Sequence, residues 1–140
     1  MISFKEVTGD ITLADIPIAH QQNIQELLKR ANVVREKWGK PMRVTSGYRT
    51  QQDHLRIYSE INARRTKQGL EPLKVPMSSK HLSGQAIDIS DPRGELQQWL
   101  MKNADVLLTQ GLWCESFDHT LTWVHFQIVP PRSGKRFFIP

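Results

Sequence analysis

The longest regular pattern in the sequence is helical, and it limits what the rest of the chain can fold into. Over residues 21–38 the apolar side chains recur mostly three or four positions apart; they are Ile24, Leu27, Leu28, Ala31, Val34 and Trp38. This spacing places them on one face of an amphipathic α-helix, and Gly39 and Pro41 end it. A helix with a single apolar face is stable only against a partner layer, which the remaining chain must supply.

Short strand patterns supply that layer. Strands are expected at 42–46, at 85–89 and in a hairpin over 111–129 that turns at 117–120. Further helices are expected from an N-cap at Thr50 to a stop at Gly69, and from about Glu95. The tail, residues 130–140, is basic and carries no predicted element. Together these elements predict an α+β fold in which helices flank a small antiparallel sheet.

Length and cysteine content restrict the organisation of the chain. A chain of 140 residues fits one domain, 1–140, with one buried core. Its longest apolar runs are far too short to cross a bilayer, and residues 1–6 show no secretory signal. The single cysteine, Cys114, excludes an internal disulfide and a cysteine-based metal cluster. We therefore expect a cytoplasmic protein without stable membrane insertion.

The charge balance bears on the kind of partner. A formal net charge of +5 and an isoelectric point near 9.6 suit an anionic partner, such as nucleic acid or the bacterial envelope. An equally good interpretation is a basic surface that only keeps the protein soluble. The basic residues are scattered and no nucleic-acid recognition motif is present, so no nucleic-acid partner is predicted.

Three side chains stand out as candidate metal ligands: His81, Asp88 and His125. Asp88 lies between Ile87 and Ile89, so its carboxylate must either point to solvent or find a partner. Strand alternation alone leaves both orientations open. A single histidine in a strand is more often a hydrogen-bonded polar residue than a ligand. Two imidazoles and a carboxylate would nevertheless suit a catalytic zinc ion, which needs three protein ligands and one open position.

The segment from Ser79 to Asp88 adds a specific pattern. Its sequence, SKHLSGQAID, matches Ser-x-His-x-x-Gly-x-Ala-x-Asp at every fixed position. The chain therefore resembles the zinc-dependent D-alanyl-D-alanine peptidase family, which is related to vancomycin-resistance dipeptidases, phage L-alanyl-D-glutamate endopeptidases and the hedgehog signalling domain. Residues 44–50, VTSGYRT, resemble the family's Ser-Gly-Tyr-Arg segment, and residues 123–126, WVHF, resemble the strand that carries its last histidine.

The resemblance implies a hedgehog/DD-peptidase-like fold, a Zn²⁺ cofactor and roles for individual residues. His81, Asp88 and His125 would bind zinc, and Ser79 would orient the first ligand or contact the substrate. Arg49 would bind a substrate carboxylate or polarise the scissile carbonyl, because a guanidinium donates two parallel hydrogen bonds. The implied enzyme is a monomer that cleaves a peptide bond in peptidoglycan, at D-Ala-D-Ala or at L-Ala-D-Glu. Like a phage lysis enzyme, it would reach the cell wall after the membrane is permeabilised.

The general base departs from the simplest pattern of the family. Many relatives carry an acid three positions before the last histidine, where this chain has Thr122. Others take the acid from the preceding hairpin strand, and a turn near residues 119–120 would place Glu115 opposite residues 123–125. Glu115 is therefore the predicted base, and Asp118 in the turn is the alternative. If neither carboxylate reaches the site, the chain is a zinc-binding module without peptidase activity.

For two further histidines and the two hairpin tryptophans, the sequence favours a structural role over a role in the site. His54 and His119 are predicted to be surface residues. Trp113 and Trp123 occupy hairpin positions where cross-strand or core packing is the default, and lining a cleft is the alternative. Within the zinc-peptidase pattern, Gly84 permits a turn or a close approach of the backbone to its neighbours.

Overall fold

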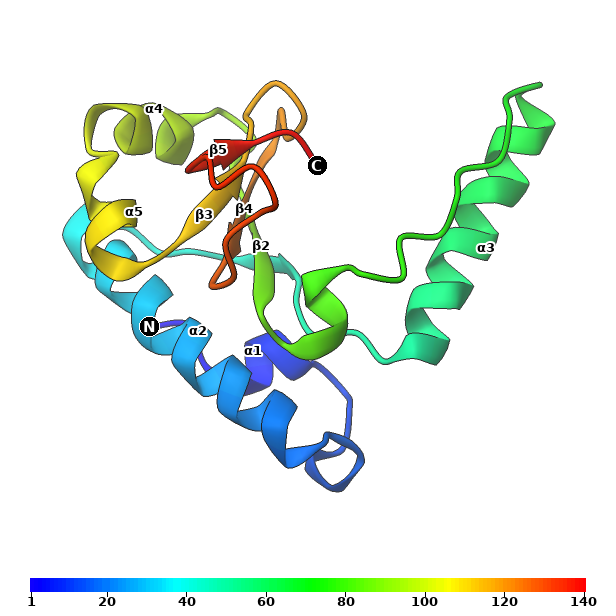
Figure 1. Cartoon of the computed structure of the whole chain (residues 1–140), viewed down its shortest axis with the longest axis horizontal. Coiled ribbons are helices and arrows are strands. Elements are labelled where there is room, and N and C mark those ends of the chain that lie inside the picture. Colours follow the sequence, from blue (N-terminus) through cyan, green and yellow to red (C-terminus); the bar gives the residue numbers. More distant parts are fainter.

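Five α-helices and one mixed sheet make up the computed structural model, which describes residues 1–140 (Figure 1). The helices are α1 (Phe4–Thr8), α2 (Ile18–Trp38), α3 (Gln51–Lys67), α4 (Glu95–Lys102) and α5 (Asp105–Gln110). The strands are β1 (Val44–Ser46), β2 (Ala86–Ser90), β3 (Trp113–Glu115), β4 (Trp123–Gln127) and β5 (Phe137–Phe138). Short 3-10 helices cover Leu13–Asp15 and Lys80–Ser83. The predicted α+β class is confirmed.

The strands form one sheet in the order β1-β2-β4-β3-β5. Antiparallel pairing joins β1 to β2, β2 to β4 and β4 to β3, in agreement with the predicted antiparallel sheet. The sequence did not predict β5, which pairs parallel to β3 and makes the sheet mixed. A two-residue strand has no alternation to detect. It forms because the tail folds back along β3, where the Cys114 N–H donates to the Arg136 carbonyl at 2.9 Å.

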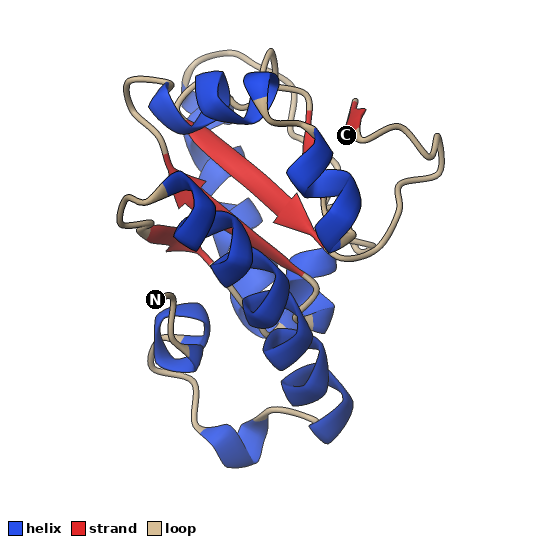
Figure 2. Ribbon diagram, turned by 90° about the vertical axis from the view of Figure 1, so that its left-hand side faces the viewer, coloured by secondary structure: helices blue, strands red, loops and turns tan.

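The two faces of the sheet have different surroundings. On one face the side chains of Ile87, Ile89 and Phe126 are fully buried in a core of 19 residues, which also contains apolar side chains from α2, α4 and α5. Figure 2, viewed from the helix side, shows these helices crossing in front of the strands. Because side chains alternate along a strand, Asp88 and His125 point to the opposite, open face.

Helix α2 confirms the long helical pattern. It begins at Ile18 rather than at residue 21 and ends at Trp38, as predicted. The N–H of Gly39, which follows with a left-handed backbone (φ 79°), donates to the Arg35 carbonyl. The sequence did not predict α1 or α5, because helices of five and six residues are too short to show a periodicity. No helix of the structure combines the length and the apolar character that crossing a membrane requires.

Helix α3 stands apart from the sheet (Figure 1). Thr50 caps it as predicted, with its Oγ1 accepting a hydrogen bond from the Asp53 N–H at 3.1 Å. The one buried residue of α3 is His54, near its start. The helix is therefore anchored at its N-terminal end, directly after Arg49, while the rest extends into solvent.

Candidate active site

One row of side chains crosses the open face of the sheet. Ser46 on β1 pairs with Asp88 on β2, and Asp88 pairs with His125 on β4. Continuing the register of β3 against β4 places Glu115 opposite His125. Directly opposed residues in such a ladder have Cβ atoms about 4.5–5.5 Å apart. The sheet thus aligns polar groups that are distant in the sequence.

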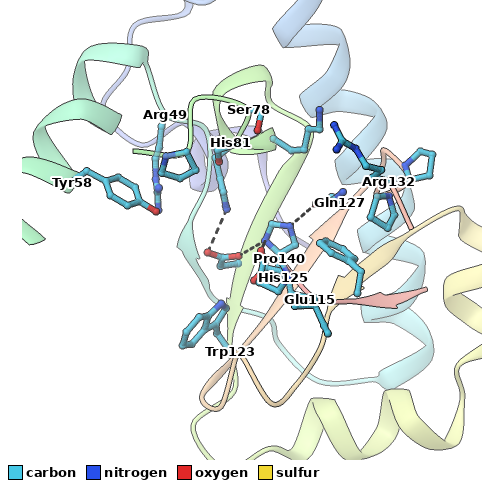
Figure 3. Close-up of a pocket in the computed structure, with 18 residues that line it drawn as sticks. Arg49, Tyr58, Ser78, His81, Glu115, Trp123, His125, Gln127, Arg132 and Pro140 are labelled. Atoms are coloured by element: carbon cyan, nitrogen blue, oxygen red, sulfur yellow. Dashed lines mark hydrogen bonds and ion pairs between the residues drawn. The ribbon is translucent and has the colours of Figure 1, made fainter. Parts of the chain in front are cut away.

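His81 joins this row from the short helix Lys80–Ser83, just before β2. Gly84 follows that helix with a left-handed backbone (φ 74°), and a Cβ there would lie 2.7 Å from the Ile24 side chain. The predicted close approach at Gly84 is thus confirmed. The turn brings His81 Nε2 to 3.4 Å from Asp88 Oδ2, while His125 Nδ1 lies 2.9 Å from Asp88 Oδ1 (Figure 3).

These three side chains offer donor atoms suited to a divalent metal ion. One ligand atom from each lies within 4.8 Å of the others. His81 Nδ1 donates to the Gly47 carbonyl at 2.8 Å, which leaves the lone pair of Nε2 facing the centre. His125 Nε2 donates to Gln127 Oε1 at 2.8 Å, so Nδ1 is the ring nitrogen that faces the centre, and in the neutral ring its lone pair is available to an ion. Histidines that bind metal are typically held in this way, and zinc accepts such a set of two nitrogens and one oxygen.

Gln127 fixes the orientation of the His125 ring. Its Nε2 donates to the Val129 carbonyl at 2.7 Å, so its Oε1 faces the imidazole and can only accept. Ala86 lies opposite Gln127 in the ladder, and its small side chain leaves room for the amide. Sequence reasoning missed Gln127, although strand alternation places it on the same face as His125; the orientation of its amide depends on the path of the chain after β4.

Replacing Gln127 by leucine is expected to weaken zinc binding by about 10- to 100-fold, the usual effect of removing the partner of a metal-binding histidine. Leucine is of similar size but has no acceptor for the His125 Nε2–H. Competition with a chromogenic chelator measures the affinity. Gln127→Glu keeps an acceptor oxygen and should recover most of the affinity. A leucine variant that binds zinc as tightly as the natural protein would contradict this assignment.

The electrostatics of the site favour an ionised Asp88. Burial raises the pKa of the Asp88 carboxyl, but the close contacts of its oxygens with the His125 and His81 rings outweigh burial and hold that pKa well below its ordinary value. Burial lowers the pKa of His125, whereas the contact with Asp88 and the charge of Glu115 raise it, and the net pKa is raised. The carboxylate therefore carries, at neutral pH, the negative charge that a bound cation requires.

Glu115 lies beside the ligands, and Asp118 does not. Glu115 is half-buried in the cleft, with its Oε1 3.8 Å from His125 Nδ1. Asp118 is exposed in the connection between β3 and β4 and does not line the cleft. Thr122, at the position where many relatives carry an acid, is also exposed and outside the cleft. The structure thus brings the predicted base, and not its alternative, to the candidate metal centre.

Arg49 reaches the cleft from the connection between β1 and α3 (Figure 3). Its Nη2 donates to Ser46 Oγ at 2.6 Å, and its Nη1 lies 3.4 Å from His54 Nδ1. His54 is fully buried and its Nε2 donates to the Pro76 carbonyl at 3.0 Å, so the prediction of a surface residue was wrong. Burial lowers the pKa of His54, which keeps the ring neutral and its Nδ1 available to Arg49. The sequence gives no sign of this, because the burial comes from a loop that folds over the helix.

Ser79 and Trp123 line the cleft, whereas Trp113 does not. Ser79 lines the cleft but makes no hydrogen bond to His81, so it does not orient that ligand. Trp123 also lines the cleft instead of packing in the core. Trp113 lies under Arg136, whose guanidinium carbon is 4.4 Å from the ring centroid. The environment of Trp113 thus depends on the tail, which sequence reasoning left without structure.

The cleft around these residues has a volume of about 690 Å³ and opens to solvent. That volume is in the range of pockets that bind small molecules. The segment after β4 builds one of its walls, with Pro130, Pro131, Arg132 and Phe138 among the lining residues. The candidate metal centre therefore lies at the bottom of a cleft that admits a substrate.

The fold and the site together define a protein with a candidate metal centre of two histidines and one aspartate in an open cleft. The family model VanY, D-alanyl-D-alanine carboxypeptidase, matches residues 17–122, more than half of the chain. The chain belongs to this family, as its motifs predicted. The match includes His81 and Asp88, whereas His125 lies beyond its end. No curated protein and no solved structure matches the chain.

Proposed function

We propose that the protein is a zinc-dependent peptidase that hydrolyses peptide bonds in the stem peptides of bacterial peptidoglycan. The observation that carries the proposal is the convergence of ligand atoms from His81, Asp88 and His125 within 4.8 Å, at the bottom of an open cleft. Membership of the D-alanyl-D-alanine carboxypeptidase family supports the substrate class. A zinc ion held by these residues supplies the Lewis acidity that peptide hydrolysis requires.

The other residues of the cleft have complementary roles in this proposal. Glu115 takes a proton from the attacking water and delivers it to the leaving amine, as a general base and then a general acid. Arg49 binds the substrate and stabilises the negative charge that develops on the scissile carbonyl oxygen. Its contacts with Ser46 and His54 hold the guanidinium in place before the substrate arrives. Ser79 contacts the bound peptide from the same wall as His81.

The alternative function is a zinc-binding module without peptidase activity. The observation in its favour is Thr122, which replaces the acid of many relatives and lies outside the cleft. The position of Glu115 favours the enzyme, because a carboxylate 3.8 Å from His125 stands where a general base is needed. The two functions differ in one measurable property, the release of peptide products.

Incubation of the zinc-loaded protein with purified sacculi, with and without a chelator, tests the proposal. Mass spectrometry of the products is expected to reveal new peptide termini that the chelator prevents. Loss of a single C-terminal alanine identifies D-Ala-D-Ala carboxypeptidase action, whereas a new N-terminal D-glutamate identifies endopeptidase action at L-Ala-D-Glu. Zinc-loaded protein that releases no product would favour the non-catalytic module, and cleavage that persists in the chelator would refute zinc dependence.

A further inference from the structure

Three cations line the cleft, and none of them has an acidic partner. They are Arg49, Lys80 and Arg132, and no ion pair joins any of them to an aspartate or glutamate. The only acids in the cleft are Asp88 and Glu115, and both lie against His125. Positive charge in a concave site concentrates anions there. The cleft is therefore arranged to accept a ligand with negative charge.

The three cations differ in their hydrogen bonds. Arg49 is held by Ser46 and His54. Neither Lys80 nor Arg132 makes a side-chain hydrogen bond within the protein, although both are carried on ordered backbone. The Lys80 carbonyl accepts from the Gln85 N–H at 2.9 Å. These two side chains consequently keep all their donors available for a ligand.

Arg132 is placed by rigid chain geometry. It follows Pro130 and Pro131, whose rings restrict the backbone. The Gly134 N–H then donates to the Pro131 carbonyl at 2.9 Å and closes a turn around Arg132. In Figure 3, Arg132 and Arg49 lie on opposite sides of His81. A ligand that spans the centre therefore meets a cation at each end.

We propose that Lys80 and Arg132 form a second carboxylate subsite, separate from Arg49, which binds an internal free carboxylate of an acidic stem peptide. A guanidinium and an ammonium together provide charge-assisted hydrogen bonds to one carboxylate. This inference rests on the proposed function, because it assumes that the ligand is a peptide lying across the metal centre. It adds that the preferred substrate carries free carboxylates in its interior as well as at its C-terminus.

Two soluble pentapeptide stems test the subsite. In one the internal carboxylates are free, in the other they are amidated, and both keep a free C-terminal carboxylate. The zinc-loaded natural protein is expected to cleave the free acid with a kcat/KM about 10-fold or more above that of the amide, the ratio expected for one charged hydrogen bond. In the Lys80→Gln/Arg132→Gln double variant this ratio should fall to about one. The substitutions lower kcat/KM for the free acid, whereas kcat/KM for the amidated peptide should not change, because that peptide has no internal carboxylate to bind.

The Lys74→Gln/Lys135→Gln double variant is the matched control. It removes the same charge from two exposed lysines outside the cleft, and it should keep the preference for the free acid. The subsite is refuted if the natural protein cleaves both peptides equally, if the Lys80/Arg132 variant keeps the preference, or if both double variants lose it to the same extent.

Binding separates the subsite from the proposed function. If the natural protein cleaves neither peptide, the peptidase proposal fails, and calorimetric titration of the zinc-loaded protein with the two intact peptides still tests the subsite. Tighter binding of the free acid that disappears only in the Lys80/Arg132 variant supports the subsite. Equal binding of the two peptides overturns it.

Discussion

The His81→Ala variant is expected to lose both zinc binding and peptide hydrolysis. The substitution removes one of the three candidate ligands, and the two that remain would not provide the coordination that a catalytic zinc site requires. The fold should survive, because His81 lies on the open face of the sheet, away from the core of 19 buried residues. Elemental analysis of the dialysed protein measures bound zinc, and release of alanine or muropeptides measures activity.

His119→Ala is the control for this experiment. His119 is exposed in the connection between β3 and β4 and does not line the cleft, as the sequence predicted for a surface residue. Its replacement should leave zinc content and activity unchanged. A His81→Ala protein that is folded by circular dichroism and retains one zinc ion per chain would remove the basis of the proposed metal centre.

The Glu115→Gln variant is expected to keep zinc and to lose turnover by about 100- to 10,000-fold, the range typical for a general acid–base group. Glutamine preserves the size of the side chain and its polar contacts but cannot take a proton. Because Glu115 is not among the three candidate ligands, zinc content should not change. Steady-state kinetics on a stem peptide, with zinc content measured on the same sample, checks both parts.

Asp118→Asn tests the alternative base under the same conditions. Asp118 is exposed outside the cleft, so this variant should turn over like the natural protein. A Glu115→Gln enzyme with full activity would contradict the assignment of the base. Loss of activity in Asp118→Asn alone would identify Asp118 as the general base. It would also imply that the connection between β3 and β4 moves when substrate binds.

Local patterns in the sequence determined the elements that depend on neighbouring residues. The apolar spacing in α2 and the cap at Thr50 act within one or two turns of helix, and both predictions are confirmed. The motif from Ser79 to Asp88 was sufficient to predict the family, because its fixed residues all lie in one short turn and the strand that follows it. Gly84 illustrates this: its left-handed backbone and its contact with Ile24 exclude a larger residue.

The sequence also placed Glu115 near the last histidine, because a hairpin fixes the register of its own two strands. The sequence could not place Gln127, His54 and Arg132 in the site. Gln127 follows His125 by two residues on the same face of β4, but the sequence does not show that its amide oxygen turns toward His125 while its nitrogen donates to the Val129 carbonyl, and His54 is buried only because residues around Pro76 fold over α3. Arg132 lines the cleft only because the tail returns to pair along β3.

The features that the sequence predicted differ from those that it did not predict for a physical reason. Helix periodicity, caps and tight turns arise from interactions between residues a few positions apart. Such local interactions can be predicted from the amino-acid sequence. The row Ser46, Asp88, His125 and Glu115 comes from four strands, and its alignment is a property of the sheet as a whole. The amino-acid sequence therefore determined which groups are available for chemistry, and the tertiary structure decided which of them meet.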